Sequence, residues 1–262
     1  FVRCIYNYYA FQIPCHNFKN PFMSNKFFKF KRFTIFHDRC AMKVGTDGVL
    51  LGAWTDVDNV RNIVDVGSGS GLIAMMLSQR NESAKIVAIE IDGAAAAQAL
   101  ENIESSPFRE NIVVETISFQ EFANHSNMKF DSIVSNPPFF TNSLLSPTDS
   151  RSKARHAYSL SLEELLFNSK KILTDRGTLS FIYPYSEFEL IKKIINDNRW
   201  YIHRQTDIYP KKESQYPKRV LLELALYPPL EFVSIDKLVI EVERHKYSEE
   251  YISLTKDYYL KM

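Results

Sequence analysis

Beyond residue 60, apolar β-rich runs alternate with amphipathic segments, and this alternation constrains the fold more than any other feature. The β-rich runs predict strands, and the segments between them have the apolar spacing of helices. Strand, helix, strand in strict alternation implies a parallel sheet with helices on both faces. The fold class is therefore α/β and Rossmann-like. The predicted strands are 62–66, 86–91, 112–117, 130–135 and 178–183, and the predicted helices are 72–80, 94–104, 162–173 and 187–197.

The chain after Trp200 follows a different pattern. Two β-rich runs, 201–208 and 219–227, succeed one another with only a Pro- and Lys-rich loop between them, which predicts a terminal antiparallel hairpin. Gly177 is placed to let the chain turn after the helix at 162–173. A seven-stranded sheet that ends in such a hairpin resembles the class I S-adenosylmethionine-dependent methyltransferases.

The composition is that of a chain able to bury a full core. With 262 residues and 45% hydrophobic residues, one domain with small appendages is expected. The 32 Lys and Arg against 31 Asp and Glu neither indicate nor exclude a nucleic-acid partner. Cys4, Cys15 and Cys40 have no metal-ligand spacing and form no disulfide framework. No apolar run approaches the roughly 20 residues of a membrane span, so we expect no membrane partner. The cysteine pattern suits a reducing cytoplasm and gives no reason to expect a metal.

The chain divides into four parts. Residues 1–22 lack periodicity and precede Met23, so we expect a disordered or non-native leader; a real flexible arm is the alternative. Residues 23–60 are expected to form a basic strand or hairpin and a helix that covers the cofactor pocket. Phenylalanines alternate there with Lys, Arg and Thr between Lys26 and Phe36, which predicts a strand whose basic face either contacts phosphate or is a solvated edge. Residues 61–230 are expected to form the core, which the resemblance above implies is a methyltransferase core. Residues 231–262, with an apolar run at 238–242 and a helix predicted from Ser248, have no assigned role.

A glycine-rich turn follows the first predicted strand: Asp65-Val66-Gly67-Ser68-Gly69-Ser70-Gly71. Its glycines permit a tight turn and a close approach of the backbone to a ligand, as in dinucleotide sites. Asp65 would oppose a pyrophosphate but suits the positively charged methionine end of S-adenosylmethionine. Glu90, at the end of the next strand, can accept hydrogen bonds from ribose hydroxyls in either cofactor. We therefore predict S-adenosylmethionine, held by Asp65, Gly67, Gly69, Gly71 and Glu90.

The fourth predicted strand ends in Asn136-Pro137-Pro138-Phe139. The prolines remove competing backbone donors and leave the Asn136 side-chain oxygen and the Pro137 carbonyl free to accept. Two acceptors aimed at the hydrogens of a planar amino group favour a pyramidal nitrogen, whose lone pair can point at a methyl carbon. Catalysis is then chiefly positioning and electrostatic preorganisation. We predict methyl transfer to an exocyclic amino group, with Asn136, Pro137 and Phe139 as catalytic residues, Phe139 stacking on the substrate and Asn136 also beside the cofactor.

A finer resemblance involves residues 36–54, which read Phe-His-Asp-Arg-Cys-Ala-Met-Lys-Val-Gly-Thr-Asp-Gly-Val-Leu-Leu-Gly-Ala-Trp. Together with 65–71, 136–139 and Pro217-Lys218-Arg219-Val220, they resemble the bacterial valine-tRNA adenine-N6 methyltransferases, which modify the adenine beside the anticodon. The resemblance runs from about Met23 to Tyr227. It implies a flipped adenine as substrate and a loop 43–48 across the mouth of the cofactor pocket. Lys43 and Thr46 are then cofactor contacts, and Thr46 or Asp47 is expected to cap a helix that runs to Trp54.

The contacts with the cofactor adenine and with tRNA follow from the same resemblance. Such enzymes commonly have an Asp at the end of the third strand; Ser118 stands there instead, so Ser118 and the Phe119 backbone are the expected contacts, with Glu121 as another candidate. Phosphate contacts position a nucleic acid rather than specify its sequence. Two basic groups are candidates for gripping the anticodon stem-loop: Arg151, Lys153, Arg155 and His156, and Lys211, Lys212, Lys218 and Arg219. Of these, Arg155, His156, Lys218 and Arg219 are the predicted substrate contacts.

Other functions fit parts of the pattern. A glutamine-N5 methyltransferase acting on a protein uses the same Asn-Pro-Pro turn, usually with Tyr in place of Phe139. A DNA adenine-N6 or ribosomal guanine-N2 methyltransferase is a further alternative, but neither accounts as well for residues 43–54. A catalytically silent RNA-binding module on this fold also stays open. An NAD-dependent oxidoreductase is disfavoured by Asp65 and by the Asn-Pro-Pro-Phe turn.

Overall fold

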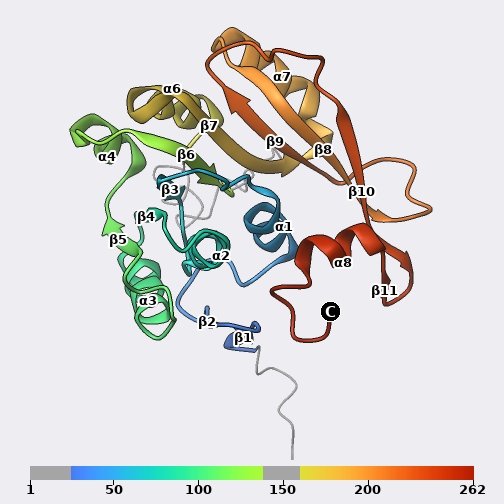
Figure 1. Ribbon diagram of the computed structural model, residues 1–262, viewed down its shortest axis with the longest axis horizontal. Helices are drawn as coiled ribbons and strands as arrows, with labels where there is room; N and C mark the ends of the chain where they lie inside the picture. The colour runs from blue at the N-terminus through green and yellow to red at the C-terminus, as the bar shows by residue number, and fades with distance from the viewer. Residues whose placement is uncertain (1–24, 138–159) are drawn as a thin grey trace, which may run out of the picture.

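The computed structural model describes residues 25–137 and 160–262. Its central element is a nine-stranded sheet with the strand order β11-β10-β8-β9-β7-β6-β3-β4-β5 (Figure 1). The five parallel strands coincide closely with the predicted ones, except that the last begins at Leu173 rather than at Thr178. These strands are β3 (Asn62–Val66), β4 (Lys85–Glu90), β5 (Ile112–Thr116), β6 (Phe130–Ser135) and β7 (Leu173–Pro184).

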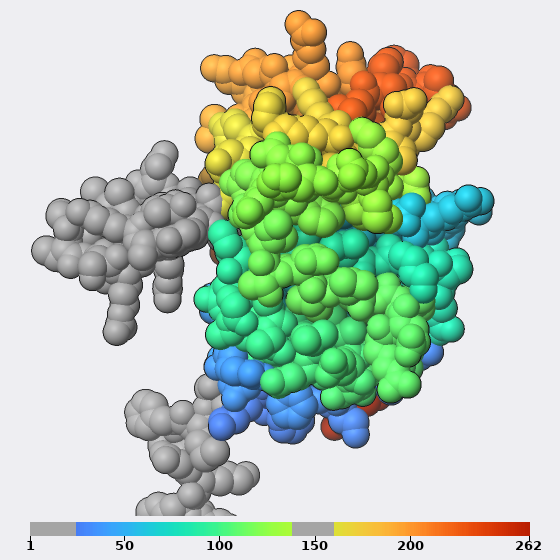
Figure 2. Space-filling model, turned by 90° about the vertical axis from the view of Figure 1, so that its left-hand side faces the viewer, coloured from blue at the N-terminus to red at the C-terminus, as the bar shows by residue number. Residues whose placement is uncertain are grey.

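Helices cover both faces of the sheet, as predicted. Successive side chains of a strand point to opposite faces. Within β3, accordingly, Ile63 packs in one buried apolar cluster and Val64 in the other. The Ile63 face is covered by α1 (Thr46–Trp54), α2 (Leu72–Arg80), α3 (Gly93–Glu104) and α8 (Glu249–Thr255). The Val64 face is covered by α4 (Phe119–His125), α6 (Leu162–Ile172) and α7 (Phe188–Asp197), and the short 3-10 helix η1 (Tyr185–Glu187) precedes α7. Figure 2 views the molecule from the β5 edge, which α3 and α4 flank.

The terminal hairpin is confirmed and the sheet extends beyond it. β8 (Tyr201–Lys211) and β9 (Arg219–Ala225) pair antiparallel, and β9 also pairs antiparallel with β7, which completes the seven predicted strands. The segment without an assigned role adds β10 (Ile235–Glu243), parallel to β8, and β11 (Lys246–Tyr247), antiparallel to β10. The helix predicted from Ser248 is α8, whose N-cap is the Ser248 hydroxyl. Within the two described stretches, no helix is both long and apolar enough to cross a membrane.

The segment from Lys26 to Phe36 forms two strands, where the alternation of Phe with basic residues predicted one. β1 (Phe27–Lys29) and β2 (Thr34–Phe36) form a separate hairpin, closed by a hydrogen bond from the Phe30 peptide N–H to the Phe33 carbonyl at 2.9 Å. Both of these phenylalanines are buried at the turn, so their burial rather than strand alternation sets the spacing. Two of the basic side chains have intramolecular partners. The Lys31 ammonium donates to the Met262 carbonyl, and Arg32 pairs with Glu82.

Two predictions about helix and strand ends are wrong. Neither Thr46 nor Asp47 caps α1, because its N-cap is Gly45 and no side chain bonds to the first turn; the Asp47 carboxylate instead pairs with Arg219. Gly177 lies inside β7 rather than in a turn before it, at a register shift between β6 and β7. A Cβ atom there would lie 2.6 Å from the Leu173 side chain and 3.0 Å from the Phe130 carbonyl, so this bulge requires glycine.

Candidate active site

The predicted glycine-rich turn connects β3 to α2. Gly67, Gly69 and Gly71 take φ angles of 70°, 54° and 79°, a left-handed region that L side chains rarely adopt. The peptide N–H groups of Gly67 and Ser68 both donate to the Ile89 carbonyl at 2.9 Å. These bonds fix the turn against the end of β4, where the first two glycines line the neighbouring cleft.

Asp65, predicted to hold the cofactor, lies beneath this turn. It has no exposed surface, and Oδ2 accepts a hydrogen bond from the Ala74 peptide N–H at 3.0 Å. Oδ1 has no hydrogen-bond partner among the described residues. Burial disfavours the charged carboxylate and raises the pKa of Asp65 to about 7. The hydrogen bond from Ala74 lowers this pKa, and the negative charge of Glu90 raises it further. Asp65 therefore ties the turn to α2 and influences the cleft through the backbone.

The variant Asp65→Asn is expected to gain more stability at pH 8 than at pH 5. The unfolded carboxyl has a pKa near ~4, whereas the folded pKa is about 7, so the folded state binds the proton more tightly. The contribution of the protonated Asp65 carboxyl to the stability of the wild type is complete below the unfolded pKa and is lost as pH rises through 7. The asparagine keeps an acceptor for Ala74 and carries no charge. The difference in Tm between variant and wild type should therefore widen from pH 5 to pH 8; a constant difference would contradict the raised pKa.

Glu90 lies at the end of β4, as predicted. Its Oε2 accepts from the Gly69 peptide N–H at 2.8 Å and its Oε1 from the Asp92 peptide N–H at 2.9 Å. A carboxylate oxygen can accept two hydrogen bonds, so both oxygens retain capacity for a ligand hydroxyl. Asp92, which was not predicted, caps α3 through bonds to Ala94 and Ala95 and lines the same cleft. An Asp directly before an Ala-rich helical run is an N-cap pattern, and this signal would have found it.

The cleft consists of two hollows that share Met42, Gly67, Gly69 and Asn136. The first has a volume of ≈ 250 Å³ and the second of ≈ 280 Å³. The first also contains Glu90, Ile91, Ser118, Phe119, Gln120 and Pro137. The second contains all of loop 43–48, with the predicted residues Lys43 and Thr46, and also Ser68 and Ser70. The structure thus places the predicted cofactor residues along one cleft, apart from Asp65 and Gly71, which line neither hollow.

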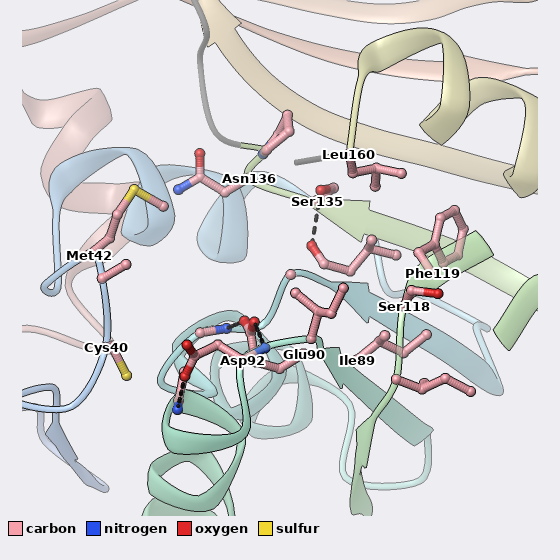
Figure 3. Close-up of a pocket in the computed structure, with 18 of the residues that line it drawn as sticks. Cys40, Met42, Ile89, Glu90, Asp92, Ser118, Phe119, Ser135, Asn136 and Leu160 are labelled. Carbon is pink, nitrogen blue, oxygen red and sulfur yellow. Dashed lines mark hydrogen bonds between the residues drawn. The ribbon is translucent and has the colours of Figure 1, made fainter. Parts of the chain in front are cut away.

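Asn136 directly follows β6 and lines both hollows, and its side chain points toward Met42 (Figure 3). Its Oδ1 is buried and has no hydrogen-bond partner among residues 25–137 and 160–262. Leaving a buried acceptor unpaired costs about 1–3 kcal/mol, so this oxygen is a candidate acceptor for a donor on a ligand. The other predicted residues of this region, Pro138, Phe139, Arg151, Lys153, Arg155 and His156, lie outside the described residues.

The residues that follow β5 form one wall of the first hollow. The Ser118 hydroxyl is the N-cap of α4 and accepts from the Glu121 peptide N–H at 3.2 Å. Phe119 is buried beside it. Gln120, which was not predicted, lines the same hollow. Its position in a polar helical segment gives no signal that separates it from a solvated residue.

Two buried polar side chains of α3 hold the segment after β2 beside the glycine turn. Asn102 accepts from the Phe36 peptide N–H at 3.0 Å, and its Nδ2 donates to the Phe36 carbonyl at 2.8 Å and to the Ser70 carbonyl at 3.0 Å. Gln98 accepts from the Cys40 thiol at 3.2 Å. Neither residue was predicted, because polar residues of an amphipathic helix are expected on its solvated face. The wall of the first hollow at Cys40 therefore depends on α3.

The second basic group lies around the β8–β9 connection. Arg219 Nε donates to the Asp47 carboxylate at 2.8 Å, and both side chains are mostly buried. This ion pair joins the start of β9 to the first turn of α1, so Arg219 supports Asp47, which lines the second hollow. The other three members, Lys211, Lys212 and Lys218, are exposed.

Comparisons with known proteins agree with this geometry. Residues 43–183, more than half of the chain, match the family described as Methyltransferase small domain. The chain is 47% identical over 241 residues to the tRNA1(Val) (adenine(37)-N6)-methyltransferase of Bacteroides fragilis, which covers 92% of the chain and 100% of the relative. It is 45% identical over 240 residues to the protein of the same name from Parabacteroides distasonis, with the same coverage.

The solved structure of a predicted O-methyltransferase from Agrobacterium tumefaciens superimposes with a TM-score of 0.63 at 18% identity. The match covers 81% of this chain and 96% of that one, and it shows the shared fold. The matching family includes the glycine turn, Glu90 and Asn136 within its bounds, and the curated relatives match along nearly their whole length. The chain therefore belongs to the tRNA1(Val) (adenine(37)-N6)-methyltransferase family.

Proposed function

We propose that this protein transfers the methyl group of S-adenosylmethionine to the N6 amino group of adenine 37 in tRNA1(Val), the activity in its relatives' names. The observation that carries the proposal is the buried Asn136 Oδ1 at the junction of the two hollows, which has no hydrogen-bond partner among the described residues. A buried acceptor at this point suits the N–H of an exocyclic amino group. The names of the relatives favour this substrate over a protein glutamine, DNA adenine or ribosomal guanine.

The two hollows fit the two ends of S-adenosylmethionine, the cofactor that family membership implies. The first is mostly apolar and contains the Glu90 carboxylate, which suits an adenosine with free ribose hydroxyls. The second adjoins the first turn of α1, whose N–H groups bond to no capping side chain and suit a carboxylate. When bound, this cofactor supplies an electrophilic methyl group on a positively charged sulfur. The residues proposed to hold it are Lys43, Thr46, Gly67, Gly69, Glu90, Ser118, Phe119 and Asn136, with Asp65 and Gly71 shaping the turn.

The protein's own part in the reaction is to position the amino group. Asn136 Oδ1 and the Pro137 carbonyl accept from the two N6 hydrogens, which favours a pyramidal nitrogen with its lone pair available. Phe139 is proposed as the stacking partner of the flipped adenine. Preorganised acceptors need no rearrangement at the moment of reaction, so the rate gain comes from positioning and electrostatics.

The substrate contacts and the setting of the reaction are proposed from the same family membership. Arg155, His156, Lys218 and Arg219 are proposed to contact the anticodon stem-loop, Arg219 partly through its pairing with Asp47. We also propose that the reaction takes place in the cytoplasm. The proposed division of the chain is a covering segment (23–60), a core (61–230) and an extension (231–262).

The test is methyl transfer from labelled S-adenosylmethionine to total tRNA from a strain that lacks this gene, followed by mass spectrometry of nucleosides. The expected product is N6-methyladenosine in valine tRNA. Label that enters ribosomal RNA, DNA or a protein glutamine, with none in tRNA, would exclude the proposed substrate.

A further inference from the structure

A groove outside the cofactor cleft lies between the N-terminal hairpin and the C-terminal segment. Its volume is ≈ 640 Å³, and its walls come from β1, the first residue of α1, the end of β8, and residues between 240 and 262. In Figure 1, the red segment from β11 through α8 to the chain end lies between β10 and the blue hairpin. The proposed reaction gives this segment no role.

The groove carries an excess of positive charge. Lys29, Lys211 and Lys261 line it and are exposed, and none of them forms an ion pair or a side-chain hydrogen bond with another residue of the described chain. Glu241 is the acidic residue of the lining. Among the lining side chains, three cations against one anion contrast with a net charge of +1 for the whole chain. Unpaired lysines gathered in one groove suit a polyanion.

Aromatic side chains lie among these lysines. The Tyr247 ring is 38% exposed, and its centroid lies 5.2 Å from that of Tyr251. The Tyr251 hydroxyl contacts that of Tyr259 at 3.4 Å, and the Tyr259 ring lies 5.9 Å from that of Phe28. Tyr247 is thus a partly exposed ring supported from within. Rings combined with cations are how proteins bind unpaired nucleotides.

The groove adjoins the candidate active site through Thr46. This residue lines both the groove and the second hollow, which contains Asn136. The groove therefore borders the cleft that contains Asn136, and the nucleotides next to a base bound there are the part of the substrate that would reach it. A protein partner gains nothing from this continuity, which favours RNA over an acidic protein surface.

We propose that this groove binds the RNA that flanks the methylated adenine, with Lys29, Lys211 and Lys261 on phosphates and Tyr247 stacked on an unpaired base. The choice of RNA rests on the proposed function. The C-terminal segment is then part of the substrate-binding surface, and its lysines determine affinity rather than chemistry.

The test compares two triple charge reversals with equal changes in net charge. The groove variant is Lys29→Glu, Lys211→Glu, Lys261→Glu; the control is Lys85→Glu, Lys129→Glu, Lys193→Glu, three exposed lysines outside the groove. The groove variant is expected to raise the Kd for tRNA by roughly tenfold or more, and to reduce the slope of log Kd against log salt by about 2. The control should stay within about twofold of wild type under the same salt. Both should bind S-adenosylmethionine like wild type.

A second pair of variants tests the stacking contact. Tyr247→Ala is expected to raise the Kd for tRNA roughly fivefold or more, the lower limit for one stacked base, whereas Tyr247→Phe keeps the ring and should bind as wild type. Equal affinity of both triple variants for tRNA would overturn the proposal, and is the result expected if an acidic protein occupies the groove. If wild type binds tRNA through the groove but transfers no methyl to it, only the proposed function fails. If it methylates tRNA and the groove variant has the wild-type KM, only the groove fails.

Discussion

Replacing Asn136 by alanine is expected to slow methyl transfer to tRNA by roughly 100-fold or more, the usual cost of losing one preorganised polar contact to the reacting group. The physical reason is the Asn136 Oδ1 between the two hollows, which no described residue pairs with: its removal leaves the amino group without the acceptor that orients its lone pair. Affinity for S-adenosylmethionine should stay within a few-fold of wild type, because the glycine turn and Glu90 are untouched. Single-turnover rates and a separate cofactor titration measure the two effects.

Two further variants make this test specific. Asn136→Asp retains an acceptor at the same place and should fall between the alanine variant and wild type. Asn124→Ala removes an exposed asparagine of α4 that lines neither hollow, and should leave the rate unchanged. Full activity of Asn136→Ala would rule out the proposed role of this residue.

Replacing Asn102 by alanine is expected to lower the free energy of unfolding by about 3–5 kcal/mol, because the side chain makes three hydrogen bonds and its loss strands backbone groups of Phe36 and Ser70. Urea denaturation measures this as a lower midpoint with an unchanged m-value. Affinity for S-adenosylmethionine should fall as well, since the bond to Ser70 supports the glycine turn. Glu104→Ala, an exposed change on the same helix, is the matched control. A loss below about 1 kcal/mol would mean that water replaces the side chain.

Local patterns predicted most of the sheet and its helices. The parallel strands are short apolar runs bounded by helical segments. Each strand or helix pattern can be recognised from about ten consecutive residues. The predictions that failed depend on distant partners. Thr46 or Asp47 was expected to cap α1, but neither does, and the Asp47 carboxylate pairs with Arg219, 172 residues later. Phe28 and Phe30 alternate with Lys29 and Lys31 as in one strand, yet Phe30 and Phe33 are both buried at the turn of a hairpin.

The same division holds at the candidate site. The glycine turn and Asn136 were predicted because their chemistry is encoded in consecutive residues. Asp65 was assigned to the cofactor by its place before the turn. Only the packed structure shows that its side chain is buried and accepts a hydrogen bond from the Ala74 peptide N–H. Gln98 and Asn102 gave no signal, because their partners are backbone groups of a segment about 60 residues earlier.

The hydrogen bonds between the N-terminal hairpin and the C-terminal segment affect the order in which the protein folds. The Lys31 peptide N–H donates to the Tyr258 carbonyl at 2.8 Å, and its ammonium donates to the Lys256 carbonyl, 225 residues later, at 2.6 Å. Synthesis runs from the N-terminus, so the hairpin emerges from the ribosome long before these partners exist. The parallel strands can assemble on the ribosome. The contacts of the hairpin with Lys256 and Tyr258 can form only after those residues have left the ribosome, whereas its contacts with Asn102 and Glu82 can form earlier.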